Sequence, residues 1–359
     1  MPAFNGQLKS NHIFTAIFNM IISQQVFADN IKGTHSKIVD KARVDAGLYG
    51  DTKLYYATDA LKSAPWGNDA EAQNLLQLHR PASPECQAIT LDQFRQISLT
   101  VDNYLTKRAW STENAFSEFN SVMLGWIRDT KRIYDSTYYN AFIGTAESSV
   151  GKQTVELAIS DVVGSTTGEE ANKLEAQAIA QGLADLFVEM SDVSRDFNDY
   201  GYLRSYDMSD IKVIWNSKIV NKIRKVDLPT IFHKEGLVDK FDQDVLPSRY
   251  FGTVNTAGGT TTSANTNVRS LIEKDYGEVH LFPGDLLPNS TEYLANETYT
   301  VDEDIICKVY VKLPPFMSAF EVGTSFFNPK SLTENHYLTW GYNTLEYLKN
   351  YPMITVHRD

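Results

Sequence analysis

The chain has 359 residues, of which 42% are hydrophobic and 22% are charged. These proportions are ordinary for a globular protein, and the length allows a sizeable core divided into two or three lobes. The formal net charge of −12 argues against a general nucleic-acid-binding face. Cys86 and Cys307, the two cysteines, are too few for a disulfide framework and fit a reduced cytoplasmic setting. The sequence leaves open whether they pair.

Residues 1–36 are predicted to form an amphipathic arm that docks on another surface. An apolar run at 13–22 faintly resembles a signal peptide. However, Lys9 alone supplies positive charge ahead of the run, and Asn19 interrupts it. The run is also too short to span a membrane.

Residues 37–87 carry charges of alternating sign, with Gly47 and Gly50 as turn signals between short extended runs. No sustained helical face is seen in the sequence of this segment. The pattern predicts a long two-stranded loop that projects from the body. An isolated hairpin is marginal in water, so such a loop needs a surface to lie on. An ordinary solvated excursion is the alternative.

A strand is predicted at 89–105, where Ile97, Leu99 and Val101 alternate with polar residues. A long amphipathic helix is predicted at 111–142. Its apolar face comprises Phe116, Phe119, Met123, Trp126, Ile133, Tyr134, Tyr138, Ala141 and Phe142. A helix of this length spans roughly 45 Å and exceeds the usual length of about 11–12 residues. It is expected to pack on the sheet through its first four apolar residues, and it favours a structural role over an enzymatic one.

Further elements follow in chain order. Thr167 and Glu170 form a capping-box pattern that predicts a second amphipathic helix of roughly twenty residues. Strands are predicted at 154–159, 211–215, 305–313 and 353–356, a helix begins at 217–225, and a mobile surface loop is expected at 255–267. In 305–313 the apolar residues alternate strictly, and Pro314-Pro315 stop the strand.

The chain carries no recognisable catalytic motif. Residues 146–153 come nearest to a phosphate loop, but Gln153 stands where Ser or Thr should hold Mg²⁺, and the segment follows a helix. The seven histidines show no metal-binding spacing. We therefore predict no catalytic residue, no cofactor and no metal site. A carboxylate pair for glycoside hydrolysis stays open, because any two of 45 acidic residues can meet in the fold.

The order of elements and two local segments resemble the major capsid proteins of tailed bacteriophages. The segments are Phe-Asn-Asp-Tyr-Gly-Tyr-Leu-Arg at 197–204 and Asp-Ile-Lys-Val-Ile-Trp-Asn at 210–216. The strand and helix over 97–142 are similar to the peripheral-domain strand and spine helix of that family. Its fold, the Hong Kong 97-type fold, is shared by encapsulins and herpesvirus shells.

The resemblance implies an α+β fold with four parts, one of which contains a long spine helix. These are an N-terminal arm (1–36), an extended loop (37–87), a peripheral domain (88–150) that contains the spine helix (111–142) and is completed by part of 300–359, and an axial domain (151–299). It also implies no enzyme activity and self-assembly into the hexamers and pentamers of an icosahedral shell around double-stranded DNA. Expected partners are a separate scaffolding protein, a portal protein and DNA bound without sequence specificity, with no membrane. The expected location is the virion, after assembly in the bacterial host cytoplasm.

Contacts between subunits are expected from the apolar run of the arm and the charges of the loop. The candidate residues are Ile13, Phe14, Phe18, Lys41, Arg43, Asp45, Lys53 and Asp59. Charge pairs of this kind set register and partner choice more than affinity. The alternatives are an encapsulin-like cellular compartment shell and a secreted, aromatic-rich glycan-binding protein or enzyme.

Overall fold

The computed structural model describes residues 37–47, 50–63, 78, 80–102, 113–148, 150–224, 242–256, 275–276, 279–280 and 297–359. The arm predicted at 1–36 lies outside this set, as does most of the tract at 255–267. The chain divides into two compact units. The first comprises Met1–Asp51, Thr90–Ser136 and Phe316–Thr344, and the second comprises Thr52–Ile89, Thr137–Pro315 and Leu345–Asp359.

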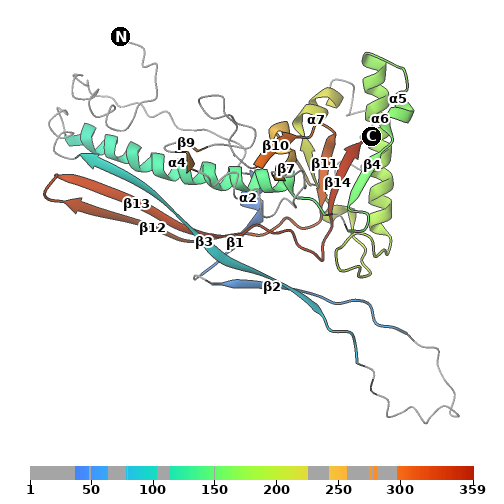
Figure 1. Cartoon of the computed structure of the whole chain (residues 1–359), viewed down its shortest axis with the longest axis horizontal. Helices are drawn as coiled ribbons and strands as arrows, with labels where there is room; N and C mark the ends of the chain where they lie inside the picture. Colours follow the sequence, from blue (N-terminus) through green and yellow to red (C-terminus); the bar gives the residue numbers. More distant parts are fainter. Residues whose placement is uncertain are drawn as a thin grey trace. The chain divides into compact units, whose positions relative to one another are not determined.

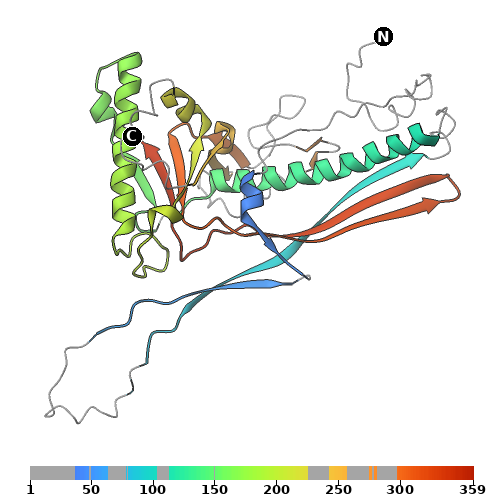
Figure 2. The same ribbon diagram turned by 180° about the vertical axis from the view of Figure 1, so that it is seen from behind.

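The first sheet has five strands in the order β1-β12-β13-β3-β2. They are β1 (Arg43–Asp45), β12 (Phe316–Asn328), β13 (Thr333–Asn343), β3 (Glu85–Asp102) and β2 (Thr52–Ala57). β12 and β13 form a long antiparallel hairpin that lies beside β3 (Figures 1 and 2). β1 runs parallel to the first three residues of β12. Aromatic and β-branched residues, which favour extended backbone, are frequent in both strands of the hairpin.

The strand predicted at 89–105 is confirmed as β3, which begins four residues earlier. Ile97 and Leu99 are half-buried and Val101 is buried, whereas the residues between them are exposed. A short helix, α2 (Lys37–Ala42), was missed by the sequence analysis. Six residues are too few to establish a helical period, although α2 buries Ile38, Val39 and Ala42.

The helix predicted at 111–142 is confirmed as α4, which spans the 33 residues Glu113–Thr145. Within the first unit, α4 contacts β13 through Tyr134, whose ring lies edge-on to Trp340 and Tyr342, with centroids 5.8 Å apart in each pair. The prediction that Trp126 packs on the sheet is wrong, because its side chain is 47% exposed. Ile127 is buried instead, since one step along a helix turns the side chain by about 100°. The side chains of Phe116, Phe119 and Met123 lie outside the described set.

The second unit contains a five-stranded sheet in the order β4-β14-β11-β5-β6. These strands are β4 (Thr154–Leu157), β14 (Met353–Arg358), β11 (Ile305–Tyr310), β5 (Lys212–Asn216) and β6 (Asp242–Leu246). β11 is antiparallel to both of its neighbours, whereas the two edge strands run parallel to theirs. The core of this unit includes Ile179, Leu183 and Phe187 of helix α6 (Glu169–Ser191) together with Trp215 and Ile306 of the sheet.

Two sequence-based expectations for the second unit are corrected. Strict alternation of apolar residues predicted a strand over 305–313 that ends at Pro314-Pro315, but β11 ends at Tyr310 and all six of its residues are buried. β11 is an inner strand that is covered on both faces, so even Lys308 in its middle is buried. The prediction that Thr167 and Glu170 form a capping box is also wrong. α6 begins at Glu169 behind Gly168, which has φ 79°, and no side chain caps it. The chain turns at this glycine, so Thr167 falls outside the cap position.

The remaining elements are short. They are α5 (Ile159–Val163), α7 (Ser217–Arg224), β7 (Gly252–Thr256), β8 (Asp275–Tyr276), β9 (Val279–His280) and β10 (Glu297–Val301), with single turns of 3₁₀ helix at η2 (Met208–Asp210) and η4 (Ser248–Tyr250). β7 pairs with β10, and β8 pairs with β9. Helix α7 confirms the helix start predicted at 217–225.

Candidate functional site

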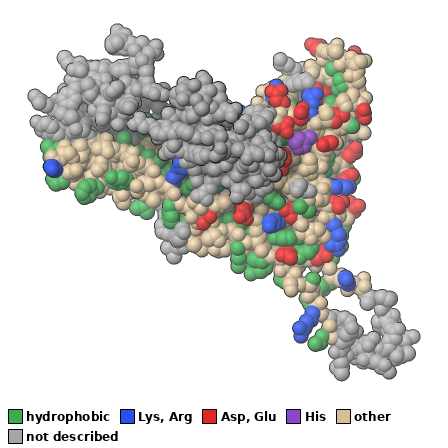
Figure 3. All heavy atoms as spheres, in the orientation of Figure 1, with side chains coloured by type: hydrophobic (Ala, Val, Ile, Leu, Met, Phe, Trp, Pro, Cys, Tyr) green, Lys and Arg blue, Asp and Glu red, His purple; other side chains and the backbone are tan. Residues whose placement is uncertain are grey.

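Four exposed apolar side chains lie along the outer part of the β12–β13 hairpin, with Phe326 and Phe327 on opposite faces of β12 because successive strand residues alternate. They are Val322, Phe326, Phe327 and Leu332, which are 41–62% exposed. We call these four residues the hairpin surface, and Figure 3 shows hydrophobic side chains along this part of the molecule. Among the described residues, 322–328 of β12 pair with β13 alone, because β1 reaches only as far as Ser318. An apolar strand edge of this kind invites pairing with another chain.

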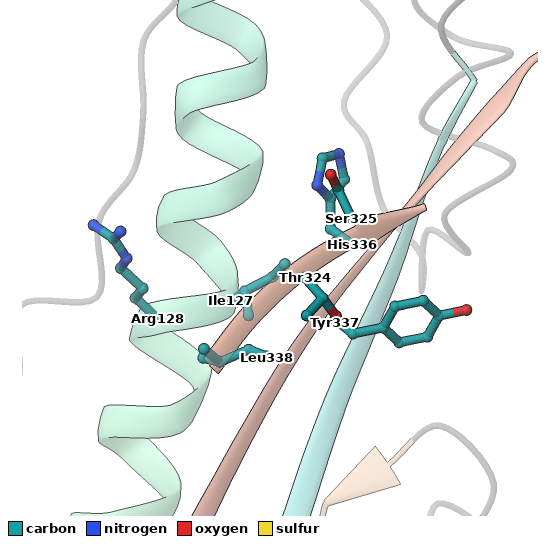
Figure 4. A pocket seen from close by; sticks show the side chains of 8 residues that line it. Ile127, Arg128, Thr324, Ser325, His336, Tyr337 and Leu338 are labelled. Carbon is teal, nitrogen blue, oxygen red and sulfur yellow. The ribbon is translucent and has the colours of Figure 1, made fainter. Parts of the chain in front are cut away.

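A pocket of about 320 Å³ lies between this hairpin and α4. Ile127 and Leu338 face each other across it, whereas Arg128 and Tyr337 extend away on opposite sides (Figure 4). The side chains of Ser325 and His336, which are partners in the hairpin register, lie together at the strand side of the pocket (Figure 4). The pocket therefore has an apolar floor and polar walls and adjoins the hairpin surface.

A second set of exposed apolar side chains lies on β2 and on the chain beyond it. Leu54, Tyr56, Leu61 and Leu78 are 51–79% exposed, and we call them the loop surface. On β2 the exposed residues alternate with half-buried ones, as expected for a strand with one free face. These exposed leucines and the tyrosine belong to the second unit, within Thr52–Ile89.

Arg43, one of the predicted contact residues, is bound within the first unit. Its guanidinium lies 2.9 Å from Asp40 Oδ1 and 3.3 Å from Asp135 Oδ2, and it also lies over the Phe316 ring. Asp135 is only 1% exposed and lies 3.6 Å from the Lys131 ammonium. Burial raises the pKa of Asp135, and the Lys131 and Arg43 charges oppose that shift. Arg43 thus stabilises a buried carboxylate.

Asp59, another predicted contact residue, is bound within the second unit. Its carboxylate accepts hydrogen bonds from the Leu203 N–H at 3.1 Å and from Arg195 Nη1 at 2.8 Å. The Leu203 N–H and the Arg195 side chain lower the pKa of Asp59 to about 2. Asp59, which lies just after β2, therefore links this part of the extended loop to the chain that follows α6.

The other predicted contact residues are placed as follows. Lys41 and Asp45 are exposed, and Lys53 is half-buried. Ile13, Phe14 and Phe18 lie outside the described residues. A role in contacts between subunits stays a prediction for all eight candidates.

Lys308 is fully buried in β11 and is the centre of a charged cluster in the second unit. Its ammonium donates to the Ala146 carbonyl and to Thr355 Oγ1, each at 2.8 Å, and lies 3.6 Å from Glu147 Oε1. Burial lowers the pKa of Lys308 to about 8, against the opposing effect of the Glu147 carboxylate. His357 extends the cluster, because its ring nitrogens lie 3.7 Å from Glu147 and 3.9 Å from Asp302.

The segment 146–153, which came nearest to a phosphate loop, has structural contacts instead. Its first two residues hold Lys308, as described above. Gln153 is buried, accepts from the Met353 N–H at 2.9 Å and donates to Asp199 Oδ1 at 2.5 Å. Ser148 also donates to Asp199 Oδ1, at 2.8 Å. The segment thus joins β14 to the loop after α6.

The described part of the chain lacks two features that would point to other functions. It holds no group of three His, Cys, Asp or Glu side chains that could bind a metal ion. None of its helices combines the length and the apolar character needed to cross a bilayer.

Comparison with known proteins identifies the fold. The chain is similar to a chain in the capsid of Staphylococcus phage Andhra, with 9% identity, a TM-score of 0.62, and 95% of this chain and 90% of that chain covered. A chain from the structure of the head fibre and inner core protein gp22 of native bacteriophage P68 gives 10% identity, a TM-score of 0.60, and coverage of 94% and 87%. A chain of the bacteriophage PhiM1 mature capsid gives 10% identity and a TM-score of 0.50, with 94% of this chain and 91% of that chain covered. Comparison with curated proteins finds no match.

The mixed α/β fold is shared with chains of phage capsids over most of their length. The family model for the Phi29-like phage major capsid protein matches residues 5–345, and the chain belongs to that family. It is therefore a shell-forming structural protein of a phage rather than an enzyme. An encapsulin-like compartment and a glycan-binding protein are not favoured.

The hairpin surface was not among the contacts predicted from the sequence. A signal was present, because Phe326-Phe327 precede the turn residues Asn328-Pro329 at the end of an extended apolar run. Part of 300–359 was expected to complete the peripheral domain, but β12 and β13 were not predicted as strands.

Proposed function

We propose that the chain is the major capsid protein of a tailed bacteriophage, with the Hong Kong 97-type fold, and that it assembles into an icosahedral shell enclosing double-stranded DNA. The observation that carries this proposal is the family match over residues 5–345. The unusually long helix α4 and two separate exposed apolar surfaces support it, because a subunit in a shell must present contacts to neighbours on more than one side.

In this proposal the chain has the parts of a shell subunit. Residues 1–36 are the arm, 37–87 the extended loop, 88–150 the peripheral domain with α4 as its spine, completed by part of 300–359, and 151–299 the axial domain. Lys41, Asp45 and Lys53 remain the candidate polar contacts of the loop. Arg43 and Asp59 have the additional intramolecular roles described above.

We infer that the loop surface of one subunit covers the hairpin surface of the next. The two surfaces differ in sequence and geometry, so a contact between them is heterologous, and a heterologous contact that is repeated around an axis closes into a ring. The exposed edge at 322–328 would gain main-chain partners from an extended segment of the neighbour. The rings would be the hexamers and pentamers of the shell.

The proposed partners follow from that role. They are other copies of the chain, a separate scaffolding protein, a portal protein, and packaged DNA bound without sequence specificity. The net charge of −12 suits an inner wall that does not bind the packaged DNA tightly. The subunits would assemble in the bacterial host cytoplasm and end in the virion.

Electron microscopy of the purified protein, alone and with candidate scaffolding protein, tests the proposal. We expect closed shells with pentamers and hexamers, and double-stranded DNA inside particles recovered from infected cells. Particles that carry a protein cargo in place of DNA would contradict the proposal. So would a protein that stays monomeric under every assembly condition.

A further inference from the structure

The turn that joins β12 to β13 contains a leucine in an unfavourable backbone conformation. Leu332 has φ 56°, in the left-handed region where the Cβ of an L-residue crowds the backbone. The other described residues with a positive φ are all glycines, namely Gly50, Gly151, Gly164, Gly168 and Gly201. Glycine has no Cβ and adopts this conformation without crowding. The leucine at 332 therefore carries a cost that the rest of the described chain avoids.

The turn is closed by polar contacts that do not involve the leucine side chain. It comprises residues 329–332, between Asn328 of β12 and Thr333 of β13, which are partners in the hairpin register. The Lys330 N–H donates to Asn328 Oδ1 at 3.0 Å, and the hydroxyl oxygens of Ser331 and Thr333 lie 2.7 Å apart. Glycine and asparagine are the residues that ordinarily take a left-handed position in a turn. Either of them at 332 would leave these contacts in place.

The Leu332 side chain is not buried in the core of the subunit. It is 41% exposed, and its turn lies at the end of the hairpin opposite to the one where β1 pairs with β12 (Figures 1 and 2). Phe326 and Phe327, also exposed, directly precede the turn on β12. Strained residues persist mainly where function requires them. What leucine offers here, and glycine or asparagine does not, is exposed apolar surface that another molecule can cover.

We propose that Leu332 is a contact residue between subunits, whose side chain packs against a second copy of the chain and so offsets the strain of its own backbone. A second copy is the partner because the family to which the chain belongs forms shells, in which every subunit presents the same turn to a neighbour. The inference rests on the proposed function and deepens it. It assigns to one residue of the hairpin surface a role that favours association at a cost to the isolated subunit.

The variant Leu332→Asn tests the inference, because asparagine tolerates a positive φ and removes the apolar side chain. We expect the melting temperature of the unassembled subunit to stay the same or to rise, since the strain is relieved. The concentration needed for assembly should rise by roughly tenfold, because the apolar contact is lost. Leu332→Met keeps both the strain and the apolar surface and should match the wild type in both quantities. Calorimetry and sedimentation measure them.

Val193→Asn is the matched control, because Val193 is an exposed apolar residue just after α6 without a positive φ, and it should assemble normally. Normal assembly of Leu332→Asn would overturn the inference. So would a clear fall in its melting temperature, because the leucine would then stabilise the subunit itself. Equal impairment of Leu332→Met would also overturn it, since apolar surface would not be what matters. All three results leave wild-type shells intact, whereas a wild-type protein that never forms shells would overturn the proposed function.

Discussion

At the scale of single residues, buried charges determine how the first unit tolerates substitution. Asp135 is almost completely buried and depends on Arg43 and Lys131 for compensation. A buried carboxylate that loses a partner is strongly destabilising, because its desolvation is no longer offset. Arg43 therefore differs from Lys41, two residues away, whose side chain is exposed.

Charge reversal at Arg43 and at Lys41 should have different effects on the free energy of unfolding. We expect Arg43→Glu to lower the free energy of unfolding by about 3 kcal/mol, because it places a second carboxylate beside Asp135. Lys41→Glu should change it by less than about 0.5 kcal/mol and should impair assembly more than stability. Urea unfolding of the unassembled subunit gives the first quantity, and sedimentation gives the second. Equal losses of stability in the two variants would contradict the role assigned to Arg43.

Lys308 predicts a pH dependence of stability. Burial lowers its pKa from 10.5 to about 8 in the folded protein. Between these two values the unfolded chain binds more protons than the folded chain, so the contribution of Lys308 to stability increases with pH. The unfolding free energy of the wild type, minus that of Lys308→Met, should rise by about 3 kcal/mol from pH 7 to pH 10.5. Denaturation at several pH values checks this, and a difference that is constant with pH would contradict it.

At the scale of elements, the C-terminal end of α4 is fixed by a close approach of two backbones. A Cβ added to Gly144 would lie 2.0 Å from the Tyr250 carbonyl oxygen in η4. Only a residue without a side chain fits there, because a backbone carbonyl cannot move aside as a flexible side chain can. Gly125, in the same helix, has no described atom within 4 Å of the corresponding position.

Alanine substitutions at these two glycines form a matched pair. Gly144→Ala should lower the free energy of unfolding by about 3 kcal/mol through overpacking. Gly125→Ala should raise it by up to about 1 kcal/mol, because alanine is the better helix former. Urea unfolding measures both, and similar stabilities for the two variants would mean that α4 and η4 are farther apart than described.

The positions of helices and strands were more predictable from the sequence than the burial and contacts of their side chains. Periodicity located α4, β3 and α6, because a repeat of 3.6 or 2 residues is a local property of the sequence. It could not show that β11 is covered on both faces, because that depends on helices and strands distant in the sequence. The same limit explains the error at Trp126, where the helix face was correct only to within one residue. Of the candidate contacts, sequence could identify exposed charge but not that Arg43 and Asp59 bind partners in the same chain.

At the scale of the whole molecule, the exposed apolar side chains of the hairpin surface favour association between subunits. Phe326 and Phe327 are 62% and 49% exposed, and further burial of each contributes roughly 1 kcal/mol to association. Repeated at every contact of a closed shell, this modest gain becomes decisive. The hairpin surface should therefore control assembly without controlling folding.

Replacing both phenylalanines by serine tests this expectation. The melting temperature of the unassembled double variant should stay within a few degrees of the wild type, since the side chains are already exposed. The concentration required for assembly should rise at least tenfold. Val188→Ser, at an exposed position on α6, is the control and should assemble normally. Electron microscopy and sedimentation distinguish these outcomes, and unimpaired assembly of the double variant would remove the hairpin surface from the contacts.

Two buried tryptophans among the described residues offer an optical consequence. Trp340 lies in the first unit and Trp215 in the second, at 1% and 5% exposure. Trp215 Nε1 donates to Gln243 at 3.2 Å, whereas Trp340 Nε1 has no hydrogen-bond partner among the described residues. Two indoles in environments of different polarity should emit at different wavelengths. Variants that retain Trp215 or Trp340 as the single tryptophan, with the other four of the chain's five replaced, would report by fluorescence on each unit separately and would show whether the two units melt together or in succession.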